Sequence, residues 1–204
     1  MHGGGFAVGD KSSGANFATY FARLGYVTAS INYRLLAPPG CGGDREPAPE
    51  CQAAALAAQH DAQAAVRWFR ANASNYGVDP GRVAMAGSSA GAVTSILVGT
   101  RSEDPGSSGN PGPSSEIQTA VSVSGGLPTG QSIDAGDAPT LFIHGTEDRT
   151  VFPDWAALNA QTMLEAGVLG FFVPIEGAGH GLLEEHRDFV YEQTDYWLYH
   201  RLIE

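Results

Sequence analysis

The apolar residues of this chain alternate between helical spacing and short continuous runs. Phe17, Phe21 and Leu24 recur at the spacing of one helix face, and the run that begins at Val27 has the composition of a strand. The same alternation continues to the C-terminus. It predicts helices at residues 13–24, 53–75, 90–99, 154–166 and 183–202, and strands at residues 27–32, 82–86, 119–124, 140–144 and 170–174.

Helices that alternate with strands are typical of an α/β fold, in which crossover helices cover both faces of a mostly parallel sheet. Asp154 is expected to cap the fourth helix. Pro174 has no backbone N–H, which indicates that the last strand lies at a sheet edge. Residues 102–115, rich in Ser, Gly and Pro, are expected to form a flexible surface loop. A length of 204 residues favours one domain over residues 1–204.

The composition of the chain excludes several classes of partner. With 22 acidic and 11 basic residues the formal net charge is -11, which repels phosphate backbones, so nucleic acid is not an expected partner. No apolar run approaches the roughly 20 residues of a membrane-spanning helix. The N-terminus shows no basic and apolar segments of the kind that form a signal peptide.

Cys41 and Cys51 lie in a stretch rich in Pro and Gly, which is a common setting for a short disulfide. Closing so short a loop is worth about 2 to 3 kcal/mol in chain-entropy terms, and no metal ligands lie nearby. The alternative is two unrelated free thiols. A disulfide would indicate an oxidising compartment, so an extracellular or periplasmic location is expected.

The sharpest local motif is Gly87-Ser88-Ser89-Ala90-Gly91, a G-x-S-x-G sequence between a predicted strand and a predicted helix. In such a nucleophile elbow the serine stands on a strained turn that only small neighbours permit. The N-terminal end of the following helix directs its positive dipole at the reacting oxygen. The context therefore favours Ser89 as a nucleophile.

A serine hydroxyl is a weak nucleophile and needs a base to take its proton and a carboxylate to orient that base. Asp148 follows the predicted strand 140–144, and His180 lies between glycines after the predicted strand 170–174. The order Ser, Asp, His along the chain is that of α/β-hydrolases. We therefore expect Ser89 as nucleophile, His180 as general base and Asp148 as the orienting acid.

Other interpretations of these residues stay open. Asp148 could be a turn residue, and Glu147 beside it is chemically competent to replace it. His180 could be an exposed loop histidine, although its flanking glycines favour a ring packed near backbone. His144 is expected to support the acid loop. The remaining candidates lie on predicted helices, where a structural role is expected: His60, His186 and His200.

The segment Met1-His2-Gly3-Gly4-Gly5-Phe6 supplies candidate donors for the oxyanion of a tetrahedral intermediate. It resembles the HGGG motif of the esterase and lipase branch of the α/β-hydrolases, which includes carboxylesterases and hormone-sensitive-lipase-like enzymes. Asn32-Tyr33-Arg34, Ala65-Val66-Arg67-Trp68 and the Asp79-Pro80 turn extend the resemblance over nearly the whole chain. It implies an α/β-hydrolase fold, an oxyanion hole formed by the N–H groups of Gly4, Gly5 and Ala90, and a bracing role for His2.

Two features depart from the family pattern. The elbow has Ser88 where hormone-sensitive-lipase-like enzymes usually have Asp. Only Met1 precedes the HGGG segment, whereas the family has three strands before or leading into it, the third of which lies between the strands that correspond to residues 27–32 and 82–86. The resemblance therefore implies an N-terminally truncated hydrolase.

An incomplete sheet leaves backbone donors and acceptors unpaired, which is costly. We expect either direct pairing of strand 27–32 with strand 82–86 or pairing with a second copy of the chain in a homodimer. Both would move Gly3 to Gly5 relative to Ser89. The chain is therefore expected to assemble its catalytic residues but to hydrolyse esters poorly.

Only about fifteen residues separate strands 119–124 and 140–144, which leaves no room for a lid. An open site suits bulky or aryl esters, whether small or polymeric, and Phe6, Phe152 and Trp155 are candidate walls of the pocket. The resemblance implies a carboxylic ester hydrolase that uses no cofactor and no metal. An extracellular polyester hydrolase would share every catalytic residue. A binding module without catalysis is the remaining alternative, although such modules usually lose the serine or the histidine.

Overall fold

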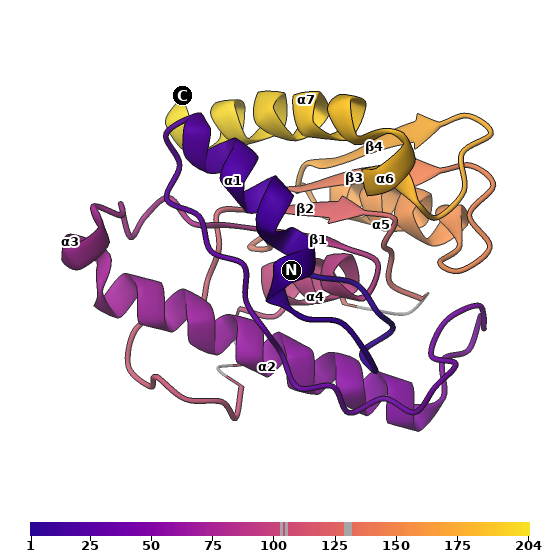
Figure 1. Ribbon diagram of the computed structural model, residues 1–204, viewed down its shortest axis with the longest axis horizontal. Helices are drawn as coiled ribbons and strands as arrows, with labels where there is room; N and C mark the ends of the chain where they lie inside the picture. The colour runs from indigo at the N-terminus through magenta and orange to yellow at the C-terminus, as the bar shows by residue number, and fades with distance from the viewer. Residues whose placement is uncertain (103, 105, 129–131) are drawn as a thin grey trace.

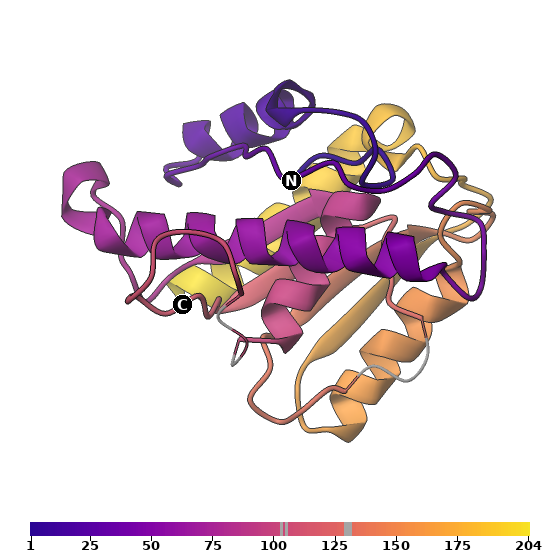
Figure 2. The same ribbon diagram turned by 90° about the horizontal axis from the view of Figure 1, so that it is seen from below.

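The computed structural model describes residues 1–102, 104, 106–128 and 132–204. Its sheet has four parallel strands in the order β1-β2-β3-β4. The strands are β1 (Ala84–Ser88), β2 (Thr119–Val123), β3 (Thr140–Gly145) and β4 (Gly170–Ile175). Helices cover both faces of this sheet (Figures 1 and 2). The predicted α/β architecture with a parallel sheet is confirmed.

The helices follow the predicted pattern with shifted ends. They are α1 (Ala15–Arg23) after a 3-10 turn (Lys11–Gly14), α2 (Pro49–Ala71), α3 (Ala73–Tyr76), α4 (Ala90–Thr100), α5 (Pro153–Glu165), α6 (Leu182–Glu185), α7 (Arg187–Leu198) and a final π-helical turn (Tyr199–Ile203). Two predicted helices are interrupted. The helix expected at 53–75 breaks at Asn72, whose side chain donates to the Trp68 carbonyl at 2.8 Å in place of regular helix geometry. The helix expected at 183–202 breaks at His186.

Side chains on opposite faces of the sheet build separate parts of the core. Val121 and Ile143 pack against residues of α1 and α7, among them Phe21 and Trp197. Phe142 points to the other face, where it packs against α4 and α5. The first and the last long helices therefore cover the same face, as Figure 1 shows for α1 and α7.

The strand predicted at residues 27–32 does not form, and its expected pairing with the strand at 82–86 is wrong. A strand is stable only beside a partner, and no described strand lies next to this segment. Side chains hold it instead: the Thr28 hydroxyl donates to the Ala18 carbonyl at 2.9 Å and the Ser30 hydroxyl donates to the Lys11 carbonyl at 2.7 Å. Among the described strands, β1 is consequently an edge. The homodimer stays a prediction.

Of the expectations for Asp154 and Pro174, the first is wrong and the second is confirmed. Asp154 is not the cap of α5, because Pro153 begins the helix and Phe152 precedes it. Asp154 instead pairs with Arg45 at 2.7 Å. Pro174 does lie in an edge strand, since β4 ends the sheet order.

The predicted loop 102–115 contains residues 103 and 105, which lie outside the described residues. Its described part has neither helix nor strand and lies against α2, where the Arg67 guanidinium donates to the Ser108 carbonyl at 3.0 Å. Flexibility of this loop stays a prediction. Across the described ranges, no helix combines the length and apolar character that a membrane crossing needs. Nor do those ranges hold a group of three or more His, Cys, Asp or Glu side chains placed to bind a metal ion.

Candidate active site

Ser89 stands on the turn between β1 and α4. Its backbone has φ 54 and ψ -121, a conformation that costs a non-glycine residue energy and that occurs mainly at functional sites. A Cβ atom on Gly87 would lie 2.2 Å from the Gly91 carbonyl, and one on Gly91 would lie 2.5 Å from the Met1 carbonyl oxygen. The turn therefore requires glycine at both positions. The Ser89 N–H donates to the Val123 carbonyl at 2.9 Å, which ties the turn to β2.

The three residues expected to act together do meet in one hydrogen-bonded chain. The Ser89 hydroxyl lies 2.9 Å from Nε2 of His180. Nδ1 of the same ring lies 2.7 Å from Oδ2 of Asp148. They come from the loops after β1, β4 and β3, and parallel strands bring such loops to one edge of a sheet. This geometry can pass a proton from the serine to the imidazole while the carboxylate orients the ring.

Asp148 is buried and its carboxylate accepts hydrogen bonds at both oxygens. Oδ1 accepts from the N–H groups of Thr150 at 2.8 Å and Val151 at 3.1 Å, and Oδ2 accepts from Nε2 of His144 at 3.0 Å as well as from His180. Burial alone would raise the pKa of this carboxyl, but these hydrogen bonds outweigh burial and hold the pKa well below its usual range. Asp148 is therefore ionised and oriented. Glu147 is exposed.

His144 lies fully buried beneath the acid loop. Its Nε2 lies 3.0 Å from both Asp148 and the Val151 carbonyl, while its Nδ1 has no partner among the described residues. A single N–H on Nε2, shared between these two acceptors, satisfies both contacts. The ring thus supports the acid loop and does not reach Ser89.

The loop that carries His180 is docked on neighbouring strand ends. The Ser124 hydroxyl donates to the His180 carbonyl at 2.9 Å, and the Glu147 N–H donates to the Ala178 carbonyl at 2.9 Å. A Cβ on Gly145 would lie 2.3 Å from that Ala178 oxygen, so only glycine permits the contact. Sequence reasoning missed Ser124 and Gly145. The signal was available, because both are small residues at the carboxyl end of a predicted strand.

Beyond the hydrogen bonds of Met1 to β1, aromatic stacking and hydrogen bonds to its own backbone hold the HGGG segment. The buried His2 ring stacks on Tyr33 at 4.2 Å between ring centres, and its Nδ1 lies 2.7 Å from the Gly3 carbonyl. The Tyr33 hydroxyl donates to the His2 carbonyl at 2.9 Å, and burial raises the pKa of that hydroxyl. Tyr33 is a second positioning residue that sequence reasoning did not single out.

The predicted oxyanion donors keep free N–H groups. Gly4 has φ 111, and a Cβ there would lie 2.0 Å from the Val8 carbonyl oxygen, so the tight turn requires glycine. Within the described part of the chain, no protein group accepts a hydrogen bond from the N–H of Gly4, Gly5 or Ala90. Gly3 and Gly4 line the same cavity as Ser89, while Gly5 lies next to the Cys41 carbonyl.

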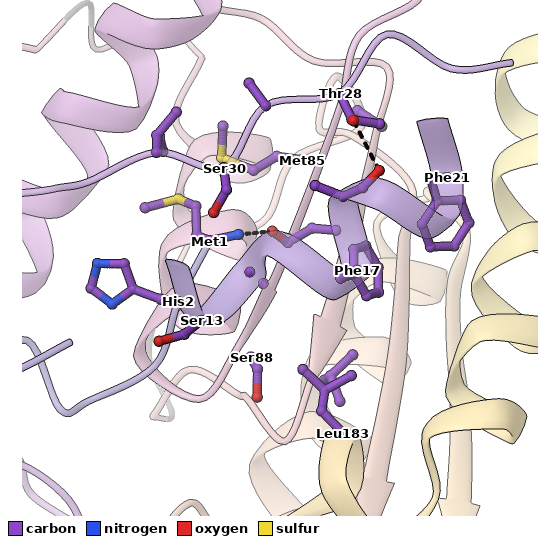
Figure 3. Close-up of a pocket in the computed structure, with 18 of the residues that line it drawn as sticks. Met1, His2, Ser13, Phe17, Phe21, Thr28, Ser30, Met85, Ser88 and Leu183 are labelled. Carbon is purple, nitrogen blue, oxygen red and sulfur yellow. Dashed lines mark hydrogen bonds between the residues drawn. The ribbon is translucent and has the colours of Figure 1, made fainter. Parts of the chain in front are cut away.

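The three predicted pocket walls do not line that cavity. Phe6 is 7% exposed and packs in the core against Tyr33. Trp155 is also buried, with its ring 5.3 Å from Phe152 in an edge-on contact, and the Arg45 guanidinium lies 4.2 Å above the Phe152 ring. The cavity that includes Ser89 is bordered instead by residues such as Phe17 and Leu183 (Figure 3).

Cys41 and Cys51 form a disulfide, with their Cα atoms 5.6 Å apart. The bond closes a strap over residues 41–51 that lies between the HGGG segment and the acid loop. On one side the Cys41 carbonyl oxygen would lie 3.0 Å from a Cβ on Gly5, and on the other the Gly43 N–H donates to the Thr150 carbonyl at 2.8 Å. The disulfide agrees with an oxidising compartment, and the location itself stays a prediction.

Comparisons with known proteins identify a family model and several relatives that this chain resembles. Residues 1–125 match the BD-FAE family model. Esterase LipI of Mycobacterium tuberculosis is 35% identical over 107 residues, which are 52% of this chain and 29% of LipI. Cholinesterase 1 of Branchiostoma lanceolatum is 38% identical over 95 residues, 46% of this chain and 25% of that protein. The chain thus spans less than a third of the length of the curated relatives it matches.

Solved structures match over the whole described fold. Thermogutta terrifontis esterase 2 phosphonylated by cyclosarin has a TM-score of 0.82 and 26% identity, covering 100% of this chain and 82% of the esterase. Its butyrate-bound form has a TM-score of 0.78 and 25% identity, covering 97% and 80%. These likenesses confirm the predicted α/β-hydrolase fold and the esterase and lipase resemblance. Since the matched model covers more than half of its residues, the chain belongs to the BD-FAE family.

Proposed function

We propose that this chain hydrolyses carboxylic esters through an acyl-enzyme intermediate on Ser89. The observation that carries the proposal is the hydrogen-bonded chain from the Ser89 hydroxyl through His180 to the buried Asp148 carboxylate. A nucleophile on a strained turn, a base within hydrogen-bond distance and an ionised orienting group are the parts that acyl transfer needs. The esterase names of the relatives support the same chemistry.

In the first half of the reaction, Ser89 Oγ forms a bond to the ester carbonyl carbon while its proton moves to Nε2 of His180. Asp148 accepts the Nδ1–H of the ring and stabilises the imidazolium. The carbonyl oxygen becomes an oxyanion, for which the free N–H groups of Gly4, Gly5 and Ala90 are the proposed donors. The tetrahedral intermediate then expels the alcohol, which takes the proton from His180.

In the second half, water replaces the alcohol. His180 removes a proton from the water as its oxygen attacks the acyl carbon, and the new tetrahedral intermediate collapses with return of the proton to Ser89 Oγ. The products are a carboxylic acid and regenerated enzyme. No step requires a cofactor.

For the substrate, we propose esters with a bulky or aryl alcohol, because only residues 124–139 separate β2 from β3 and leave no length for a lid. Butyrate binds to Thermogutta terrifontis esterase 2, and this favours esters with a short acyl group as substrates of the protein described here as well. A polyester would fit the same open site. Release of soluble acids from an aromatic polyester film tests that extension separately from small-ester hydrolysis.

The deciding experiment combines turnover with covalent labelling. The wild-type chain should release p-nitrophenol from p-nitrophenyl butyrate, and paraoxon should add one diethylphosphoryl group to the peptide that contains Ser89, as measured by mass spectrometry. Ser89→Ala should lose both signals, whereas the matched variant Ser88→Ala, which removes the neighbouring hydroxyl, should keep both. Binding of the ester without turnover and without labelling would identify a binding module and overturn the proposal.

A further inference from the structure

Ser124 directly follows β2 and has a backbone conformation that is costly for a serine. Within the described residues, the non-glycine residues with a positive φ are Phe6, Ser89, Asn110 and Ser124. Asparagine adopts this left-handed region more readily than other residues do. Ser124 has φ 53, close to the φ 54 of Ser89, the proposed nucleophile. Strained residues of this kind gather at functional sites, so the strain at Ser124 points to a role for its side chain.

Glycine would adopt the backbone of Ser124 without strain. The next two residues are glycines for a steric reason. A Cβ on Gly125 would lie 2.3 Å from the Ala92 Cβ, and a Cβ on Gly126 would lie 2.9 Å from the Ala156 nitrogen. Position 124 shows the opposite arrangement, because its backbone suits glycine but carries a hydroxymethyl group. The hydroxyl of Ser124 therefore contributes something that glycine could not.

The contribution of this hydroxyl is a hydrogen bond to the loop of the general base. The Ser124 side chain is fully buried, and its hydroxyl donates to the His180 carbonyl at 2.9 Å. The same carbonyl accepts from the Leu182 N–H at 3.0 Å. The bond from Ser124 thus acts on the backbone of the residue that carries the imidazole. A shift of this backbone would move the ring relative to the Ser89 hydroxyl.

The backbone around Ser124 contacts the supports of the other two proton-transfer residues. The Ser124 N–H donates to the Ile143 carbonyl at 2.9 Å, on the strand that leads to Asp148. The preceding carbonyl, that of Val123, accepts from the Ser89 N–H at 2.9 Å. Ser124 is therefore bonded to the strand of the acid and to the loop of the base, and it adjoins the bond to the turn of the nucleophile.

The positive φ and the hydrogen bond are parts of one arrangement. Side chains of a regular strand stand roughly perpendicular to the sheet. The His180 loop lies instead beyond the carboxyl ends of the strands, since it follows β4. The change from extended to left-handed backbone at Ser124 reorients its Cβ and lets the hydroxyl reach this loop.

We propose that Ser124 is a positioning residue for the general base, whose hydroxyl fixes the His180 backbone relative to Ser89 and Asp148. The expected effect on turnover rests on the ester hydrolysis proposed above. In that reaction, Nε2 of His180 exchanges protons in turn with the serine, the alcohol and water. It must keep its place through all these steps. A small displacement of a catalytic group can cost about 10² in rate.

Two variants separate the hydroxyl from the backbone strain. Ser124→Ala and Ser124→Gly both lack the hydroxyl, but only alanine keeps the strain. Both should lower kcat for p-nitrophenyl butyrate by about 10- to 100-fold and leave KM unchanged, because the buried side chain does not reach the substrate. The matched control is Ser122→Ala. Ser122 is a fully buried serine of β2 whose hydroxyl donates to the Gly125 carbonyl at 3.0 Å, and its loss should leave kcat unchanged.

Two further measurements do not depend on turnover. Ser124→Gly should melt about 2 to 4 °C above Ser124→Ala, because glycine adopts a positive φ without strain. Hydrogen exchange at the Leu182 amide should be about tenfold faster in both Ser124 variants than in the wild type or in Ser122→Ala. The reason is that the His180 loop opens more often once its bond to Ser124 is lost.

Several outcomes would overturn the proposal. Unchanged kcat and unchanged Leu182 exchange in both Ser124 variants would show that the hydroxyl does not position the base. An equal loss of kcat in Ser122→Ala would indicate a general loss of packing, and a raised KM with unchanged kcat would indicate a role in substrate binding. A wild type without turnover, together with faster Leu182 exchange in the Ser124 variants, would contradict the proposed ester hydrolysis but support the positioning role.

Discussion

The two parts of the candidate site rest on different supports. Ser89, Asp148 and His180 follow β1, β3 and β4, whose backbones are tied together by the ladders of the sheet. The HGGG segment hydrogen-bonds to the sheet through Met1, and its position depends further on the His2 stack with Tyr33 and on the turn at Gly4. The sheet therefore fixes the proton-transfer residues, whereas local contacts fix the proposed oxyanion donors.

This difference predicts how each part responds to damage. Side chains on the loops after β1, β3 and β4 can be removed without loss of the ladder, so such changes should affect chemistry more than stability. Substitutions in the HGGG segment should displace the proposed oxyanion donors, because few other contacts hold this segment in place. Substitutions of the proton-transfer residues should therefore remove activity from a chain that stays folded, whereas substitutions in the HGGG segment should change the geometry of the oxyanion donors.

The largest effect is expected from removal of a reacting group. Ser89→Ala and His180→Ala should each lower kcat for p-nitrophenyl butyrate by about 10⁴ to 10⁶, as in other serine hydrolases. Neither should lower the melting temperature by more than a few degrees, because each side chain lies on a loop. Steady-state kinetics and thermal unfolding check the pair. Unfolding of either variant at room temperature would contradict the separation of chemistry from stability.

Asp148→Asn should lower kcat by about 10⁴, somewhat less than loss of the base. The amide keeps the shape of the side chain but cannot stabilise the imidazolium. Glu147→Gln is the matched control, since Glu147 is an exposed neighbour, and it should leave kcat unchanged. An active Asp148→Asn beside an inactive Glu147→Gln would reverse the assignment of the acid.

Gly4→Ala tests the HGGG segment. A methyl group at this position would lie 2.0 Å from the Val8 carbonyl oxygen, so the turn must shift and carry the Gly5 N–H with it. Displacement of one oxyanion donor typically costs about 10² to 10³ in turnover. Gly109→Ala, at a glycine with nothing near its added methyl group, should be silent. Full activity of Gly4→Ala would show that the proposed donors are misassigned.

Loss of the disulfide should affect both the proton-transfer residues and the HGGG segment, with a smaller effect on kcat than the substitutions above. Replacing Cys41 and Cys51 by Ser together should reduce the free energy of unfolding by about 2 to 3 kcal/mol. A several-fold loss of kcat is expected as well, because the strap bonds the acid loop at Thr150. Denaturant titration and kinetics measure the two effects. Two titratable thiols in denatured, unreduced wild type would contradict the bond itself.

The smallest effect concerns acid stability. Because the folded-state pKa of Asp148 is depressed, its ionised form contributes stability above the ordinary aspartate pKa of about 4. That contribution is lost as the pH falls through the folded pKa. The free energy of unfolding should therefore drop between about pH 5 and pH 2, and Asp148→Asn should show a shallower drop over that range. Urea titrations at several pH values measure this. If the free energy of unfolding falls equally with pH in the wild type and in Asp148→Asn, Asp148 does not contribute to acid stability.

Local patterns predicted the elements that a parallel sheet supports. The elbow, the acid loop and the histidine loop each follow an apolar run, and such a run forms a strand wherever neighbours pair it. Residues 27–32 have the same kind of pattern and form no strand, because strand formation depends on a partner that the pattern does not contain. The strand prediction at residues 27–32 is therefore wrong because the segment lies beyond the edge of the described sheet, and not because its apolar pattern is weak.

The supporting residues of the site were hidden for a related reason. No motif indicated the contacts of Ser124, Gly145 and Tyr33, because these residues act on residues 30 to 56 positions away along the chain, as the Tyr33 bond to Gly3 and the Ser124 bond to His180 illustrate. Phe6 was predicted as a pocket wall, yet its neighbours in the fold place it in the core. Contacts of this kind depend on which loops the sheet brings together.

By itself the sequence determined the α/β class, the identities of the nucleophile, base and acid candidates, and their order, because strained turns and proton-transfer groups require particular residue types at short spacing. Only the tertiary structure decided that these side chains meet, that Asp148 rather than Glu147 faces His180, and that β1 borders an open cavity. Those outcomes depend on long-range backbone pairing and packing. No short stretch of residues specifies its own neighbour across a sheet.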